Sequence, residues 1–439
     1  MLVRGRRHDT LYTLSVKPES FSVAVNGGTV IVFDRAGRFY SLYQDGAPGG
    51  HYRRSLSGQV LHKWSSADGR CRRWLEPEEA DRLIDMAAAR LRQLLDALST
   101  PEWEWLTPPD TPAQLSDIRS VIDRGAQFDS AAARADAARF AAVYSAKSGR
   151  SAGSSPIGML PPDQYLALVL QATDGCSFNT CTFCDLYHQP FRVKTPGEFR
   201  AHIRQVRDYL GESIALRRKS IFLGAANALA IPMARLTPLL EIIQAECHAG
   251  ELWSGGEESL NPPNGLPRPN AARPDTPGVY AFLDAFTGTR KSVADYRVLA
   301  ELGLKRVYIG LESGHDPLLQ FVKKPGQAQD AIETVGAIKA AGIHVGVIVM
   351  IGLGGERFGE GHVRDTLAAL NRMPLGRGDL LYFSELVEEP DTPYPRLAAQ
   401  HDIHALDHEA RAAQRAAIRA GLNPTEVKIS NYDIREFVY

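Results

Sequence analysis

Residues 165–184 read YLALVLQATDGCSFNTCTFC, and this stretch decides the fold. Its first eight residues form a nearly continuous apolar run, which is typical of a strand buried on both faces of a parallel sheet. A loop that contains Cys176, Cys181 and Cys184 follows directly. The chain of 439 residues has five cysteines, too few for a disulfide scaffold, and three of them lie within nine residues. In a reducing compartment, this clustering indicates a metal centre.

Strands and helices alternate after this loop. The first helix has a clear start, because Thr195, Pro196 and Glu198 form a capping box with a proline at the first helical position. Six βα units predict an α/β fold with a partial parallel (β/α)6 barrel. A doubly wound open sheet is the alternative, but no strand is followed by a glycine-rich dinucleotide fingerprint. Beyond 165–172, the predicted strands are 220–225, 278–286, 306–312, 344–352 and 380–387, and the predicted helices are about 196–210, 233–249, 292–303, 327–341 and 362–373.

The sequence before the barrel has a different pattern. Short alternating strands surround hairpin sequences such as Asn26-Gly27-Gly28, so a small β-rich region is expected first. Two helices are expected next, at 77–98 and about 127–146, with the turn-rich sequence TPPDTP between them. The predicted divisions are a β-rich unit at 1–75, a helical segment and linker at 76–150, the barrel at 157–395 and a C-terminal helix and strand extension at 396–439.

Two segments rich in small and turn-forming residues interrupt these elements. Residues 145–156 are rich in serine and glycine and are predicted to be the linker that leads into the barrel. Residues 250–276 form a long insertion rich in proline and glycine before the third barrel strand. Such an insertion is either a functional lid or a surface excursion, and the sequence favours neither.

The charge pattern limits the partners. The formal net charge is −1, so no overall field attracts nucleic acid or an anionic membrane, and neither partner is expected. The local basic runs Arg217-Arg218-Lys219 and Lys323-Lys324 are interpreted as solvated faces. No apolar stretch is long enough to span a membrane, and no apolar core follows the arginines near the N-terminus. We therefore expect a cytoplasmic protein.

The residues around the three cysteines leave more than one metal open. Three thiolates on one loop can hold an iron–sulfur cubane and leave one iron open to another ligand. His188 lies four residues after Cys184, so a closed zinc site with three cysteines and one histidine is the alternative. A third interpretation is that the cysteines are ordinary buried thiols.

The three-cysteine loop after the first strand, with Phe183 just before the last cysteine, resembles that of the radical S-adenosylmethionine superfamily. The resemblance covers about 163–395. It implies that Cys176, Cys181 and Cys184 bind an oxygen-sensitive [4Fe–4S] cluster, whose open iron is ligated by the amino and carboxylate groups of S-adenosylmethionine. The sequence departs from the commonest family pattern, because four residues rather than three separate the first two cysteines.

The resemblance also implies sites for S-adenosylmethionine. IFLGAAN at 221–227 stands where the family has a Gly-Gly-Glu-like segment that binds the methionyl amino group, although only the first glycine is present. VYIGLESG at 307–314 is similar to a motif that approaches the ribose and methionyl groups, and IGLGGE at 351–356 to one beside the adenine. The implied cofactor-binding residues are Phe183, Gly224, Ala225, Asn227, Glu312, Ser313 and Gly352.

The expected function follows from this resemblance. It implies reductive cleavage of S-adenosylmethionine to a 5′-deoxyadenosyl radical, which takes hydrogen from a small-molecule substrate, with an electron donor such as flavodoxin or ferredoxin. The substrate and any catalytic residue stay unassigned, and the pocket candidates are Asp284, Thr287, Tyr382, Glu385 and Glu388. Strands four to six are similar to those of oxygen-independent coproporphyrinogen oxidase and the tRNA methylthiotransferases. The alternatives are a cluster-binding sensor or haem-handling protein without turnover, and a zinc scaffold.

Overall fold

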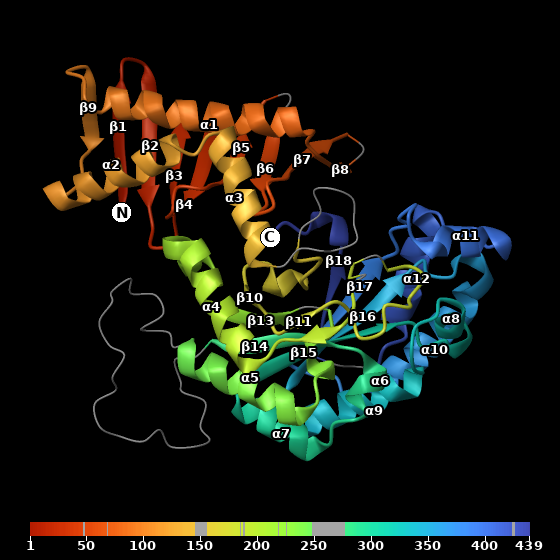
Figure 1. Ribbon diagram of the computed structural model, residues 1–439. Helices are drawn as coiled ribbons and strands as arrows, with labels where there is room; N and C mark the ends of the chain where they lie inside the picture. Colours follow the sequence, from red (N-terminus) through yellow and green to blue (C-terminus); the bar gives the residue numbers. More distant parts are fainter. Residues whose placement is uncertain are drawn as a thin grey trace, which may run out of the picture.

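The computed structural model describes residues 1–439 except 47–48, 68, 145–155, 185, 188, 218, 225, 248–276 and 424–425. His188, Ala225 and the predicted insertion at 250–276 therefore lie outside the described residues, as does nearly all of the predicted linker. Figure 1 shows an antiparallel sheet with helices on one face, next to a curved parallel sheet with helices along its outer side. None of the described helices is long and apolar enough to cross a membrane.

The N-terminal region is a nine-stranded antiparallel sheet in the order β8-β7-β6-β5-β4-β3-β2-β1-β9. Alternate residues such as Val3, Leu14 and Ile31 are buried beneath α1 and α2, as the period of two in a half-covered sheet requires. The strands are β1 (Leu2–Arg7), β2 (Thr10–Val16), β3 (Ser20–Val25), β4 (Thr29–Asp34), β5 (Phe39–Gln44), β6 (Gly50–Arg54), β7 (Val60–Ser66), β8 (Gly69–Trp74) and β9 (Trp103–Thr107), and the helices are α1 (Pro77–Ala97), α2 (Pro112–Ala126) and α3 (Ser130–Val143).

Two of these elements, β9 and α2, were not predicted. The sequence TPPDTP at 107–112 was interpreted as a break between helices, but it contains the end of β9 and the start of α2. Thr111 caps α2, since its hydroxyl accepts a hydrogen bond from the backbone N–H of Gln114 at 3.2 Å, and Pro112 occupies the first helical position. The predicted helix at about 127–146 is correspondingly shorter and begins at Ser130, after the cap residue Asp129.

The second sheet confirms the predicted fold class. Its seven strands are parallel and follow one another in the order β10-β13-β14-β15-β16-β17-β18, so the sheet is a partial barrel with β10 and β18 at its two ends. The prediction of six strands missed only the last of these as part of the barrel. The strands are β10 (Leu168–Gln171), β13 (Ser220–Gly224), β14 (Gly278–Leu283), β15 (Leu304–Glu312), β16 (His344–Ile351), β17 (Leu380–Glu385) and β18 (Lys428–Tyr432).

Helices connect these strands along the outer side of the sheet (Figure 1). The capping box predicted for α4 is confirmed, because Thr195 Oγ1 accepts from the N–H of Glu198 at 3.2 Å and the Glu198 carboxylate accepts from the N–H of Thr195 at 2.7 Å. The helices are α4 (Pro196–Leu210), α5 (Met233–Glu246), α6 (Ala285–Gly288), α7 (Val293–Glu301), α8 (Asp316–Phe321), α9 (Ala328–Ala340), α10 (Gly355–Arg372), α11 (Pro393–Gln400) and α12 (His408–Ala420).

The segment before β10 packs against the inner face of the partial barrel. Asp163 accepts hydrogen bonds from the hydroxyls of Tyr308 at 2.6 Å and Tyr382 at 2.8 Å, which come from two strands of the sheet. The hydroxyl of Tyr432 donates to the carbonyl of Leu160 at 2.8 Å. Tyr382, a predicted pocket residue, therefore holds this segment in place on the sheet.

A buried ionic network joins the N-terminal region to the barrel. Arg38, which follows β4, donates to the carboxylate of Asp136 in α3 at 2.7 Å and to the hydroxyl of Ser213 at 2.9 Å. It also donates to the carbonyl of Leu210 at the end of α4 at 3.2 Å. Cations stabilise the carboxyl ends of helices, so Arg38 links the two sheets through the end of α4.

Candidate cofactor site at the carboxyl edge of the sheet

The cysteine loop leaves the carboxyl end of β10 and is closed at its base by a short ribbon. The two strands of this ribbon are β11 (Thr173–Asp174) and β12 (Arg192–Val193), which pair antiparallel. Gly175 has a φ of 70°, and a Cβ atom there would lie 2.2 Å from the carbonyl oxygen of Gln189. Only glycine fits this close approach of the two sides of the loop.

The three cysteines of the loop are half-buried thiols. Burial raises the pKa of the Cys181 thiol, the charge of Lys324 opposes this rise, and Glu312 and Cys176 add to it. The charges that act on Cys181 thus come from Glu312, at the end of β15, and from Lys324, after α8. No group of three or more Cys, His, Asp or Glu side chains within the described ranges is arranged to hold a metal ion. Asp185 and His188 of this loop fall outside those ranges.

Hydrogen bonds on both sides of Cys181 fix the loop to the end of α8. The hydroxyl of Thr180 donates to the carbonyl of Lys323 at 3.0 Å, and the backbone N–H of Thr182 donates to the carbonyl of Val322 at 2.9 Å. The carbonyl of Thr182 in turn accepts from the N–H of Tyr394 at 3.0 Å. The path of the backbone around Cys181 is therefore set by residues that lie far away in the sequence.

Phe183 packs against a small apolar cluster beside the ends of β16 and β17. The members of this cluster are Leu318, Val322, Leu353, Leu386, Tyr394, Ala398 and Ile403. The aromatic residue before the last cysteine thus seats the loop on the rim of the sheet. Its predicted contact with a cofactor stays a prediction.

Asn227, after the end of β13, connects the cysteine loop to the end of β14. Its side-chain amide donates to the hydroxyl of Ser177 at 2.7 Å and to the carboxylate of Asp284, and its amide oxygen accepts from the N–H of Asp284 at 3.0 Å. Asp284 also caps α6, because it accepts from the N–H of Thr287 at 2.7 Å and from the hydroxyl of Thr287 at 2.5 Å. Three carboxyl ends of the sheet are therefore tied together here.

Glu312, at the end of β15, carries a buried carboxylate beside the cysteine loop. Its backbone has a φ of 59°, an uncommon conformation for a residue other than glycine. Glu312 Oε1 lies 3.5 Å from Lys324 Nζ, and only 12% and 14% of the two side chains are exposed. A Cβ atom at Gly310 would lie 2.3 Å from Glu312 Oε1, so this glycine makes the space for the carboxylate.

The second oxygen of that carboxylate, Glu312 Oε2, is buried and has no hydrogen-bond partner among the described residues. Burial raises the pKa of Glu312, and the neighbouring Lys324 opposes the rise. Burial alone would lower the pKa of Lys324. The negative charges around it outweigh burial, so the pKa of Lys324 is raised; these charges are, in order of effect, Glu312, Cys181, Asp284 and Cys184. The interpretation of Lys323-Lys324 as a solvated run was therefore wrong for Lys324, which the loop and the carboxylate cover.

Ser313 is fully buried and faces α10. Its hydroxyl lies 2.8 Å from Nδ1 of His362 and accepts from the backbone N–H of His315 at 3.0 Å. Burial, and next the charge of His315, lowers the pKa of His362 to about 4. Ser313 thus holds the turn after β15, and its predicted approach to a cofactor stays a prediction.

Gly352 begins the glycine-rich turn after β16. It has a φ of 86°, and its N–H donates to the side chain of Gln414 in α12 at 2.8 Å. Gly354 follows with a φ of 80° and donates its N–H to the hydroxyl of Tyr394 at 2.9 Å. Tyr394 therefore connects this turn with the cysteine loop.

Gly224 lies at the end of β13, where a Cβ atom would be 3.3 Å from Val169.

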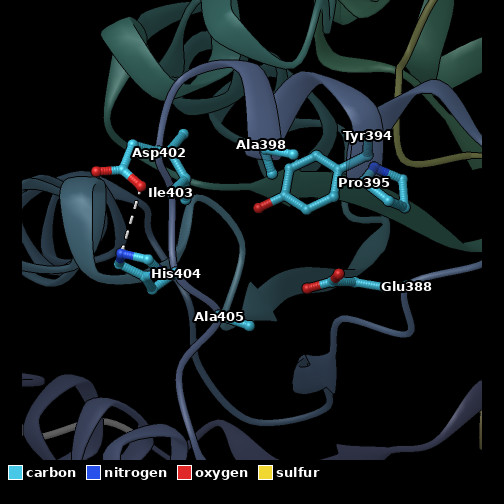
Figure 2. Close-up of a pocket in the computed structure, with 9 residues that line it drawn as sticks. Glu388, Tyr394, Pro395, Ala398, Asp402, Ile403, His404 and Ala405 are labelled. Atoms are coloured by element: carbon cyan, nitrogen blue, oxygen red, sulfur yellow. Dashed lines mark ion pairs between the residues drawn. The ribbon is translucent and has the colours of Figure 1, made fainter.

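A cavity of about 370 Å³ lies next to this turn, between α11 and the chain that leads into α12. Figure 2 shows Glu388 across the cavity from Tyr394, with the ion pair of Asp402 and His404 at its edge. Glu388 lines this cavity, and its predicted place in the substrate pocket stays a prediction. Glu385, a further pocket candidate at the end of β17, lies 3.0 Å from Arg415.

The fold and the site define an α/β partial barrel with three cysteines at the carboxyl edge of its sheet. Residues 170–367 match the family model described as the radical SAM superfamily. This part of the chain is a radical SAM domain, and the class works with a [4Fe–4S] cluster and S-adenosylmethionine. The narrower resemblance to coproporphyrinogen oxidase and the methylthiotransferases stays a prediction. Among curated proteins, none matches the chain.

Solved structures similar to the chain include OxsB, TsrM and HydG. OxsB, a cobalamin-dependent S-adenosylmethionine radical enzyme, has 14% identity and a TM-score of 0.38 over 56% of this chain and 37% of its own. TsrM, a radical S-adenosylmethionine methyltransferase from Kitasatospora setae, has 16% identity and a TM-score of 0.38, and the match covers 59% of this chain and 44% of TsrM. HydG, a maturase of the [FeFe]-hydrogenase, has 14% identity and a TM-score of 0.38, and the match covers 80% of this chain and 67% of HydG. The chain spans less than half the length of OxsB and TsrM.

Proposed function

We propose that this protein is a radical SAM enzyme in which Cys176, Cys181 and Cys184 hold a [4Fe–4S] cluster. The observation that supports this most is the three-thiol loop itself, at the carboxyl edge of the parallel sheet of a radical SAM domain. In parallel α/β barrels, chemistry takes place at this edge. When bound, the cluster supplies one electron at low potential for the cleavage of S-adenosylmethionine to a 5′-deoxyadenosyl radical.

The donor set fits this cofactor. Three thiolates on one loop leave one iron of a cubane open, whereas a closed zinc site needs a fourth protein ligand. The orphaned Glu312 Oε2 offers a buried acceptor for an ammonium or hydroxyl group, and such groups are present in S-adenosylmethionine. A buried acceptor without a partner costs about 1–3 kcal/mol, so a ligand that supplies a donor regains this free energy.

The residues around the loop position it. Asn227 holds the side of the loop that carries Ser177, and the bonds of Thr180 and Thr182 hold the side that carries Cys181. Phe183 packs on the apolar cluster at one side of the loop. A radical intermediate needs a site that excludes water, and contacts that fix the base and sides of the loop serve that need.

The first experiment measures 5′-deoxyadenosine after anaerobic purification, reconstitution with iron and sulfide, reduction and addition of S-adenosylmethionine. We expect product with the unaltered protein and none with Cys181→Ala. Cys71→Ser is the matched control, because Cys71 lies in β8, in the N-terminal sheet. Product that persists in the Cys181→Ala protein would overturn the assignment of this cysteine.

The same preparation separates the other candidate functions. Bound zinc in place of iron would favour the zinc scaffold, and a cluster that never yields 5′-deoxyadenosine would favour a sensor or haem-handling protein. The substrate class that we propose is a small molecule, and the electron donor is a flavodoxin or ferredoxin in a reducing cytoplasm. Release of 5′-deoxyadenosine that accelerates with a candidate molecule would identify that molecule as a substrate.

A further inference from the structure

Lys324 is held against the cysteine loop by contacts on both sides of Cys181. The carbonyls of Val322 and Lys323, the two residues before it, accept the hydrogen bonds of Thr182 and Thr180. The N–H of Lys324 itself donates to the carbonyl of Leu319 at 2.9 Å, so its backbone is fixed at the end of α8. The backbone of Lys324 is therefore fixed beside the part of the loop that carries Cys181.

The ammonium group of Lys324 pairs with the carboxylate of Glu312, and most of the side chain is shielded from water. Its Nζ lies 3.5 Å from Glu312 Oε1, and 14% of the side chain is exposed. Glu312 and Lys324 are thus an ion pair in a region of low dielectric constant, where charges act on one another more strongly than at the surface. Lys323, by contrast, is exposed, and solvent screens its charge.

The charge of Lys324 acts on the thiols of the loop. The hydrogen bonds of Thr180 and Thr182 to the carbonyls of Lys323 and Val322 hold this lysine's part of the chain against the loop. In keeping with this contact, Lys324 acts to lower the pKa of Cys181, and the charges of Cys181 and Cys184 act to raise the pKa of Lys324. An electron added among these thiolates would be stabilised by the positive charge of Lys324.

We propose that Lys324 is a positioning residue for charge: its ammonium group raises the reduction potential of the cluster held by Cys176, Cys181 and Cys184, and Glu312 moderates this effect. The inference rests on the proposed function. One electron from an external reductant enters the cluster, and no bond is made or broken in that step. A buried positive charge favours the reduced state because it offsets the added negative charge.

The test is a potentiometric titration of the reconstituted cluster, followed by electron paramagnetic resonance, without S-adenosylmethionine. Omission of S-adenosylmethionine separates an effect on the cluster from any contact with that cofactor. We expect Lys324→Met to lower the midpoint potential, Glu312→Gln to raise it, and Lys324→Arg to stay close to the unaltered protein. Lys323→Met is the matched control, and its potential should not move.

The outcomes are distinct. Equal potentials in the Lys324→Met, Lys323→Met and unaltered proteins would overturn this inference and leave the proposed function intact. If Lys324→Met fails to load a cluster, Glu312→Gln still decides the matter: a midpoint potential of Glu312→Gln at or below that of the unaltered protein would overturn the inference. Failure of the unaltered protein to hold a cluster would overturn both the proposed function and this inference.

Discussion

The side-chain amide of Asn227 donates to the hydroxyl of Ser177 at 2.7 Å, so the residue that follows β13 supports the loop that follows β10. The same amide donates to the carboxylate of Asp284. An amide suits this place because it supplies two donors to these groups and an acceptor to the N–H of Asp284. A carboxylate supplies no donor at all.

We therefore expect Asn227→Asp to weaken the loop. The change sets two carboxylates against each other and leaves the contact with the Asp284 carboxylate without a donor, which costs about 1–3 kcal/mol of unfolding free energy. Chemical denaturation measures the loss of unfolding free energy, and the iron content after reconstitution measures the weakening of the loop. Ser177→Ala is the comparison, because it removes one contact without adding a charge. Equal losses in the two variants would show that charge repulsion at Asp284 is unimportant.

Gly175 offers a sharper test of the loop. Gly175→Ala places a Cβ atom 2.2 Å from the carbonyl of Gln189 at a φ of 70°, so the base of the loop must open. We expect a loss of iron binding that exceeds any loss of secondary structure, measured by iron content and circular dichroism. Gly336→Ala in α9 is the control, since nothing lies within 4 Å of its Cβ position. That variant should gain about 0.5–1 kcal/mol of stability from helix propensity.

Local patterns were enough to predict the barrel and the place of the cysteine loop. The apolar runs have the length and composition of buried parallel strands, and the capping box at Thr195 is a contact between residues three apart. The rule that parallel strands present their carboxyl ends at one edge accounts for Asn227 and Asp284 lying on the same rim. Their direct contact, 57 residues apart, was beyond that rule.

The pair of Glu312 and Lys324 was not predictable in the same way. Thr180 and Lys323 are 143 residues apart, and their contact depends on how α8 packs against the loop. A dilysine sequence alone is typical of a solvated surface, so burial of one lysine had no local signal. The one available hint was Gly310 two residues before an acidic residue, since a glycine at that spacing leaves room on the same face of a strand.

The network that joins the two sheets gives a prediction about stability. Arg38→Met removes the cation shared by Asp136 and the end of α4, while Asp136 keeps its buried partner Arg54 at 3.1 Å, so the expected loss of unfolding free energy is about 1–3 kcal/mol. Arg139→Met is a matched control, because Arg139 contacts the same carboxylate at 3.5 Å from a side chain that is 67% exposed. That contact is worth at most about 1 kcal/mol. Urea denaturation measures the unfolding free energy of both variants. Equal losses of unfolding free energy in Arg38→Met and Arg139→Met would contradict the role of Arg38.

Two buried histidines predict how stability depends on pH. Burial, and next the charge of Lys194, lowers the pKa of His202 to about 3, and burial lowers that of His362 to about 4, from an ordinary value of 6.5. Below pH 6.5 the unfolded chain binds these protons and the folded chain does not. The stability from the two neutral rings is therefore complete above pH 6.5 and is lost as the pH falls from there toward 4. Each histidine contributes a slope of about 1.4 kcal/mol per pH unit.

The variant that tests this is His202→Gln. The ring nitrogen of His202 accepts a hydrogen bond from the N–H of Gln171 at 3.0 Å, and a glutamine oxygen supplies an acceptor that does not titrate. Urea denaturation between pH 5 and pH 8 should give a slope below pH 6.5 that is smaller than in the unaltered protein by about 1.4 kcal/mol per unit. His408→Gln, which removes an exposed imidazole in α12, is the control and should keep the full slope. An unchanged slope in His202→Gln would mean that His202 takes up its proton before the protein unfolds.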